Sequence, residues 1–182
     1  ERSNQPFTYQ GNIHLVFNGE IYNFQEIKKV LITKGYTYNT TSDTEVICAA
    51  YLEYGEDCVS HFNGMFAFVI FDQVKNLFFG ARDRLGQKPF YYYHNGKDFE
   101  FASQLSVVQL YNQNLSVSKK AISLYLAWGV IPDPYSIFNE IKKLRAGHSF
   151  VFDLNTHTFT EKTYWDIDYK GEKAYKGTFE EA

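Results

Sequence analysis

The apolar run from Met65 to Phe71 constrains the fold more than any other segment. Its odd and even positions are both apolar, so both faces of an extended strand over these residues need cover. We therefore predict a strand buried between two layers, and if the chain forms two sheets we expect them to meet there. The run falls far short of the ~18 apolar residues that a membrane span needs, so we expect a soluble chain with no membrane contact.

The segments before that strand predict a hairpin and a helix. Strands over 7–9 and 13–17 flank a Gln-Gly-Asn turn, and the stretch Asn18–Tyr22 is expected to end the second strand. An amphipathic helix should follow, with Asn23 and Glu26 as its capping box.

A second helix is predicted to begin at Ser42, where Ser42 and Glu45 form another capping box. The apolar run Val46–Leu52 also fits a strand, but the cap before it and Gly55 after it favour a buried helix. The remaining predicted elements are strands over 77–81, 90–94, 99–101, 149–152 and 158–164, and helices over 104–111 and 118–128. Largely antiparallel strands covered by helices place the chain in the α+β class.

The composition argues against several classes of function. The chain has 182 residues, of which 19% are aromatic, enough for one domain with a dense core. Its net charge of −3 argues against nucleic-acid binding through overall charge. Two cysteines are too few for a disulfide scaffold, so a reducing, cytoplasmic location fits best. The five histidines are scattered and there is no CxxC motif, so we expect no metal site.

The tripeptide Asn18-Gly19-Glu20 is the first candidate site. An asparagine amide beside a glycine N–H that no Cβ shields can form an oxyanion hole for a tetrahedral acyl intermediate. Asn-Gly is also common in turns, and local sequence alone favours a turn. Asp43 also has two interpretations: its carboxylate either caps a helix or holds a ligand ammonium group.

Other polar residues are expected to be structural. Cys48 lies inside a predicted helix and should behave as a small hydrophobic residue, whereas Cys58 is expected to be exposed but has no base beside it. The segment Arg82-Asp83-Arg84 is interpreted as a cluster of ion pairs that fixes the loop before Phe90.

Several segments read together resemble the glutaminase domain of glutamine-dependent asparagine synthetases. They are Asn18–Asn23, Thr41–Ile47, Phe62–Phe68 and Ala81–Tyr92, followed by Phe101-Ala102-Ser103 and Tyr164-Trp165-Asp166. A single Asn-Gly-Glu would be weak evidence, but the order and spacing of these segments match the family over residues 1 to about 168. The resemblance implies a class II glutamine amidotransferase domain over 1–168, and we expect a linker over 169–182.

The implied fold is that of the N-terminal-nucleophile hydrolases, an αββα sandwich of two antiparallel sheets flanked by helices. In that family an N-terminal Cys thiolate attacks the glutamine amide, and its own α-amino group acts as the base. The family's opening Met-Cys-Gly-Ile is absent from this chain, so the resemblance implies that the first strands and the nucleophile are missing. We then expect this chain alone to be inactive and to expose apolar surface, with self-association into a homodimer as one outcome.

The resemblance also implies the site residues. Asn18 and Gly19 would form the oxyanion hole, and Gly19, Glu20 and Asp43 would line the pocket for L-glutamine, with the two carboxylates holding its ammonium group. This domain would need no cofactor, whereas ATP and Mg would serve a C-terminal synthetase domain that makes asparagine from aspartate. Two alternatives stay open: amidation of another carboxylate, such as one on a surface polysaccharide sugar, or a non-catalytic glutamine-binding module.

Overall fold

The computed structural model describes residues 4–167, 177–178 and 180. Its strands are β1 (Phe7–Tyr9), β2 (Ile13–Ile21), β3 (Gly64–Asp72), β4 (Leu77–Arg82), β5 (Tyr91–His94), β6 (Phe99–Ala102), β7 (Ile141–Lys143), β8 (His148–Asp153) and β9 (Thr158–Thr163). Its helices are α1 (Phe24–Thr33), α2 (Asp43–Tyr54), the 3₁₀ helix η1 (Gly55–His61), α3 (Leu105–Tyr111) and α4 (Lys119–Trp128). Most of these elements were predicted, but β7 was not.

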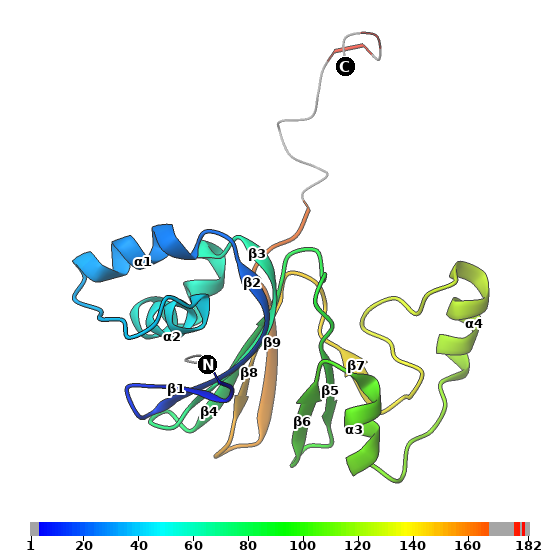
Figure 1. The fold of residues 1–182 in the computed structure, drawn as a ribbon. Coiled ribbons are helices and arrows are strands. Elements are labelled where there is room, and N and C mark those ends of the chain that lie inside the picture. The colour runs from blue at the N-terminus through cyan, green and yellow to red at the C-terminus, as the bar shows by residue number, and fades with distance from the viewer. Residues whose placement is uncertain (1–3, 168–176, 179, 181–182) are drawn as a thin grey trace.

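Two antiparallel sheets lie side by side (Figure 1). The larger has six strands in the order β1-β2-β3-β4-β8-β9, and the smaller has three in the order β6-β5-β7. Helices α1 and α2 lie on the side of the larger sheet that faces away from the smaller one, and α3 packs against β5 and β6 (Figure 1). The helix–sheet–sheet–helix order confirms the predicted α+β sandwich of two antiparallel sheets.

Strand β3 lies inside the larger sheet and is buried on both faces, as its apolar run predicted. Phe66, Phe68 and Ile70 belong to the core shared with α1 and α2. Ala67 and Val69 belong to a second core between the two sheets. The two sheets therefore meet at the strand where the sequence placed their contact.

The predicted end of the second strand at Asn18–Tyr22 is wrong, because β2 continues to Ile21 and pairs with β3 as far as Gly64. The backbones approach closely there, and glycine permits it. Gly19 has a φ of +145°, and a Cβ at this position would lie 2.1 Å from the Met65 carbonyl oxygen. Asn18 and Gly19 are therefore strand residues and not turn residues.

The predicted capping box of α1 is also wrong. The Asn23 side chain makes no cap hydrogen bond. Instead its Nδ2 donates to the His61 carbonyl at 2.9 Å, and its Oδ1 accepts from the Asn63 N–H at 2.9 Å. Asn23 thus joins the start of α1 to the segment that leads into β3.

The predicted capping box of α2 is correct for Ser42 and wrong for Glu45. The Ser42 hydroxyl accepts from the Thr44 N–H at 3.2 Å, which confirms Ser42 as N-cap. The buried Glu45 carboxylate does not return to Ser42; it accepts from the Asn39 and Thr40 N–H groups. The apolar residues that follow are helical, and Glu45 orders the loop before them.

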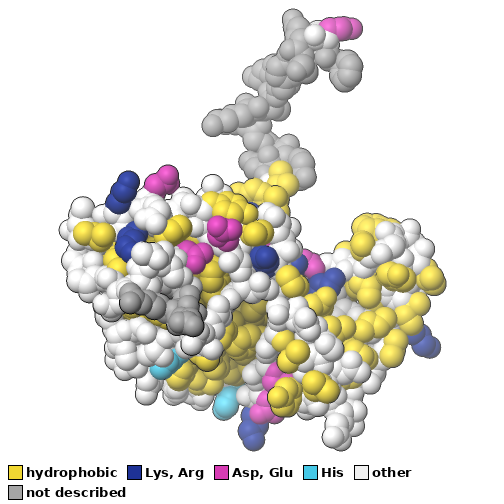
Figure 2. Space-filling model, viewed as in Figure 1, with side chains coloured by type: hydrophobic (Ala, Val, Ile, Leu, Met, Phe, Trp, Pro, Cys, Tyr) yellow, Lys and Arg dark blue, Asp and Glu magenta, His cyan; other side chains and the backbone are white. Residues whose placement is uncertain are grey.

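The outer surface adds two observations. Hydrophobic side chains gather over α4 (Figure 2), where Ile122, Tyr125, Leu126 and Trp128 are exposed. Over the residues described, none of the helices combines the length and the apolar character needed to cross a bilayer.

The predicted linker over 169–182 lies outside the described residues, apart from 177–178 and 180.

Candidate active site

A cavity of about 380 Å³ lies between the two sheets, with Asn18 in its wall. Strands β2 and β3 form one side, and β6 with the segment Pro89–Phe90 forms the other. The lining is largely apolar, with the polar side chains of Gln5, Asn18 and Ser103 among it. A mostly apolar pocket with a few polar groups is typical of small-molecule sites.

Asn18 projects its amide from the inner face of the larger sheet. Side chains alternate between the faces of a strand, and Val16, two residues earlier, packs against the core between the sheets. The Asn18 side chain is exposed and makes no hydrogen bond with the described residues. Its N–H groups are therefore free to bind a ligand in the cavity.

The main-chain N–H of Gly19 is the adjacent donor. In an antiparallel strand the N–H groups of alternate residues point to the same side. Gln5 accepts from the Phe17 N–H and Asp43 accepts from the Ile21 N–H, so the Gly19 N–H between them points to that side as well. Within the described residues no loop carbonyl or side chain accepts a hydrogen bond from it.

Two carboxylates lie beyond these donors at the same end of β2. The Asp43 Oδ2 accepts from the Ile21 N–H at 3.0 Å, and its Oδ1 accepts from the Ser42 hydroxyl at 3.3 Å. Glu20 is exposed and bonds to nothing through its side chain in the described part of the chain. Neither carboxylate forms an ion pair with a described residue, and neither lines the cavity beside Asn18.

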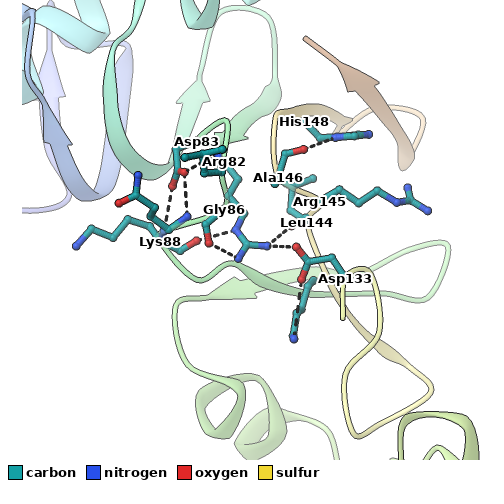
Figure 3. A network of polar contacts seen from close by, with 12 residues as sticks. Arg82, Asp83, Gly86, Lys88, Asp133, Leu144, Arg145, Ala146 and His148 are labelled. Carbon is teal, nitrogen blue, oxygen red and sulfur yellow. Dashed lines mark hydrogen bonds and ion pairs between the residues drawn. The ribbon is translucent and has the colours of Figure 1, made fainter. Parts of the chain in front are cut away.

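Arg82 joins β4 of the larger sheet to the segments on either side of β7 (Figure 3). It lies in β4, in the row Asn18–Ala67–Arg82 of directly paired residues. Its guanidinium donates to the Leu144 carbonyl at 2.6 Å and to Asp133 at 2.7 Å. It also donates to the carbonyls of residues 86 and 88, both at 2.7 Å. The Arg82 side chain is buried and holds the end of β7 against the larger sheet.

Asp83 fixes the loop that follows. Its carboxylate is fully buried and accepts four main-chain N–H groups, at 2.9 to 3.2 Å, from residues 66, 85, 87 and 88. The scaffold interpretation of this segment agrees with the structure, but the partners differ from the expected cluster. Arg82 pairs with Asp133 and with carbonyl groups, and Asp83 pairs with the backbone.

Both cysteines are buried and free. Cys48 lies inside α2 as predicted, but the expectation that Cys58 is exposed is wrong, because η1 turns it into the core. Burial raises the pKa of both thiols, since a thiolate is poorly solvated there. Neither side chain suits a nucleophile.

The glutamine amidotransferase domain family matches residues 1–165. The chain belongs to this family of glutamine amidotransferase domains. It is 45% identical over 165 residues to "Putative asparagine synthetase [glutamine-hydrolyzing] 2" of Methanocaldococcus jannaschii, with 88% of this chain and 32% of the relative aligned. It is 36% identical over 171 residues to "Asparagine synthetase [glutamine-hydrolyzing] 1" of Bacillus subtilis, with 93% of this chain and 27% of the relative aligned.

The domain thus spans about a third or less of the length of these relatives. A solved glutamine phosphoribosylpyrophosphate amidotransferase from B. subtilis has the same fold, with a TM-score of 0.58 at 17% identity over 88% of this chain and 32% of that one. The amidotransferase domain is homologous to the glutaminase domains of asparagine synthetases.

Sequence reasoning did not find two side chains that hold the site of the amidotransferase domain together. Gln5 binds the main chain of Phe17, and Asn23 binds the segment before β3. Neither contact has a signal in the local sequence, because Gln5 and Phe17 are 12 residues apart and Asn23 and His61 are 38 residues apart.

Proposed function

We propose that this domain hydrolyses the side-chain amide of L-glutamine to glutamate and ammonia. The observation that carries the proposal is the free Asn18 amide in the wall of the inter-sheet cavity, next to a Gly19 N–H on the open side of β2. Two such donors match the oxygen of a tetrahedral acyl intermediate. A purely structural Asn-Gly pair would require neither an unpartnered amide nor a cavity beside it.

In this mechanism a thiolate attacks the amide carbon and a C–S bond forms, while negative charge moves to the carbonyl oxygen. The Asn18 amide and the Gly19 N–H donate to that oxygen. When the intermediate collapses, the C–N bond breaks and the nitrogen leaves as ammonia after taking a proton. Water then cleaves the thioester and gives glutamate.

The nucleophile is proposed to come from outside residues 1–182. Cys48 and Cys58 are the two cysteines of the chain, and both thiols are buried with raised pKa values. The Glu20 and Asp43 carboxylates, which have no ion-pair partner among the described residues, are proposed to bind the substrate ammonium group.

Labelling of the whole protein tests this assignment. A glutamine analogue that carries a diazoketone should alkylate one cysteine, and peptide mass spectrometry should place the adduct outside residues 1–182. An adduct on Cys48 or Cys58 would refute the proposal. Residues 1–182 alone should release no more ammonia from glutamine than the same chain with Asn18→Ala.

For the whole protein we propose the activity of an asparagine synthetase. The ammonia would aminate an aspartate that a C-terminal synthetase domain activates with ATP and Mg, in the cytoplasm, in a monomer or a homodimer. The length and names of the relatives support this. Whole-protein assays with aspartate and other carboxylates distinguish this function from amidation of a sugar carboxylate, and the absence of any hydrolysis would favour a glutamine-binding module.

A further inference from the structure

Gln5 binds both main-chain groups of Phe17, the residue immediately before Asn18. Its Nε2 donates to the Phe17 carbonyl at 2.7 Å, and its Oε1 accepts from the Phe17 N–H at 2.7 Å. One planar side-chain amide therefore pairs with the N–H and C=O of a single residue, as the facing residue of a neighbouring strand would.

The register explains why a side chain is needed there. In the β1–β2 ladder Tyr9 pairs with Ile13 and Phe7 pairs with Leu15, so the next position of the same kind places Gln5 opposite Phe17. Strand β1 begins at Phe7, so the backbone ladder ends before it reaches Phe17. The Gln5 side chain makes the pairing with Phe17 that the backbone does not make.

This contact lies directly beside the proposed oxyanion hole. Gln5, Phe17 and Asn18 all line the inter-sheet cavity. On the far side of the site, Asp43 binds the Ile21 N–H. The two side-chain contacts bracket the strand segment from Asn18 to Glu20 and hold its open edge from both ends.

We propose that Gln5 is a positioning residue of the glutaminase site. By holding Phe17, its amide fixes the direction of the Asn18 side chain and of the Gly19 N–H toward the substrate oxygen. This inference rests on the proposed function. Oxyanion-hole donors act only when their geometry is set before the reaction, so a displacement of the strand by about 1 Å can reduce the rate up to ~100-fold.

Kinetics of the whole protein with Gln5→Leu test the inference. Loss of the contact should lower kcat for glutamine hydrolysis about tenfold or more, with KM changed less than about twofold, because transition-state stabilisation is lost and ground-state binding is not. The matched control is Gln25→Leu in α1, where the side chain is exposed and makes no hydrogen bond with a described residue. It should leave both constants unchanged.

A double variant separates positioning from general stability. If Gln5 acts through Asn18, the Gln5→Leu change should have little further effect on kcat in an Asn18→Ala background, because residues that act as a unit are not additive. An undiminished loss there, or unchanged kcat in the single variant, would overturn the inference.

Gln5→Glu supplies a readout besides activity. A carboxylate still accepts from the Phe17 N–H but repels its carbonyl oxygen, so amide exchange at Phe17 should stay protected in Gln5→Glu and accelerate in Gln5→Leu, while kcat falls in both. Equal exchange in all three proteins would refute the contact. If the unmodified protein hydrolyses glutamine no faster than Asn18→Ala, the proposed function fails instead, and the exchange data still test the Gln5 contact independently of activity.

Discussion

The Asp43 carboxylate accepts a hydrogen bond from the Ile21 main-chain N–H at 3.0 Å, and this bond joins the first turn of α2 to the end of β2. A residue that begins a helix therefore also fixes a strand edge. The same carboxylate is proposed to bind the substrate ammonium group, because a carboxylate has enough acceptor sites for both partners.

Two substitutions at Asp43 separate these roles. Asp43→Ala removes both and should lower the free energy of unfolding by about 1–3 kcal/mol. Asp43→Asn keeps an acceptor for the Ile21 N–H but loses the charge, so stability should hold while KM for glutamine rises about tenfold or more. Urea unfolding and glutaminase kinetics of the whole protein measure both effects. An unchanged KM in Asp43→Asn would exclude the binding role, and Asp57→Asn, at an exposed ion pair, is the control.

Gly19→Ala should strongly destabilise the domain. A Cβ there would lie 2.1 Å from the Met65 carbonyl oxygen, at a φ of +145° that other residues rarely adopt. We expect a loss of about 3 kcal/mol or more in the free energy of unfolding. Gly11→Ala is the matched control, because Gly11 also has positive φ but nothing within 4 Å of its added Cβ. Equal losses in urea unfolding would contradict the close-approach argument.

Arg82→Lys should lower stability although the charge is kept. One ammonium group cannot replace a guanidinium that donates to Asp133 and to three carbonyl groups. We expect the free energy of unfolding to fall by about 2–4 kcal/mol, because the buried ion pair loses part of the hydrogen bonding that offsets its desolvation. Arg145→Lys, at a more exposed ion pair with Glu161, should change stability by less than about 1 kcal/mol. Similar losses in both variants would argue against the cross-sheet role.

Stability should fall in alkaline solution. Burial raises the pKa of several acids, among them Cys48, Cys58, Tyr51, Tyr164 and Tyr92, the last to about 12. These groups stay protonated in the folded state but ionise in the unfolded chain, where a thiol has a pKa of about 8.5 and a tyrosine about 10.

The stability they contribute is therefore complete below about pH 8.5 and is lost as the pH rises above it, by about 1.4 kcal/mol per pH unit for each thiol. Urea unfolding from about pH 8 to pH 10 measures this slope, and a variant with Cys48→Ala and Cys58→Ala should flatten it. A free energy of unfolding that stays constant over this range would contradict the assignment.

The sequence predicted those parts of the fold that depend on burial patterns. The run from Met65 to Phe71 is apolar at every position, so its place between two layers followed directly. Strand β7 was missed because its pairing with β5 defines it, and three residues carry no periodicity of their own. Asn23 stands at the predicted N-cap position of α1, but its side chain makes no cap hydrogen bond because its amide bonds to residues far along the chain, which local rules do not include.

The candidate site was likewise predictable only in part from the sequence. Local sequence favoured a turn at Asn18-Gly19, and the family resemblance was needed to assign a site there. The structure shows why local rules failed: the Gly19 conformation is set by the approach of Met65 on the neighbouring strand. The burial of Cys58 was missed because the burial of a short 3₁₀ helix depends on tertiary packing, which the local sequence does not show.

The most direct test of the account is the turnover of the whole protein with Asn18→Ala. Loss of one oxyanion donor should lower kcat for glutamine hydrolysis by about 100- to 1,000-fold while KM for glutamine changes little. A variant that folds like the unmodified protein and retains its kcat would contradict the claim that the Asn18 amide stabilises the transition state.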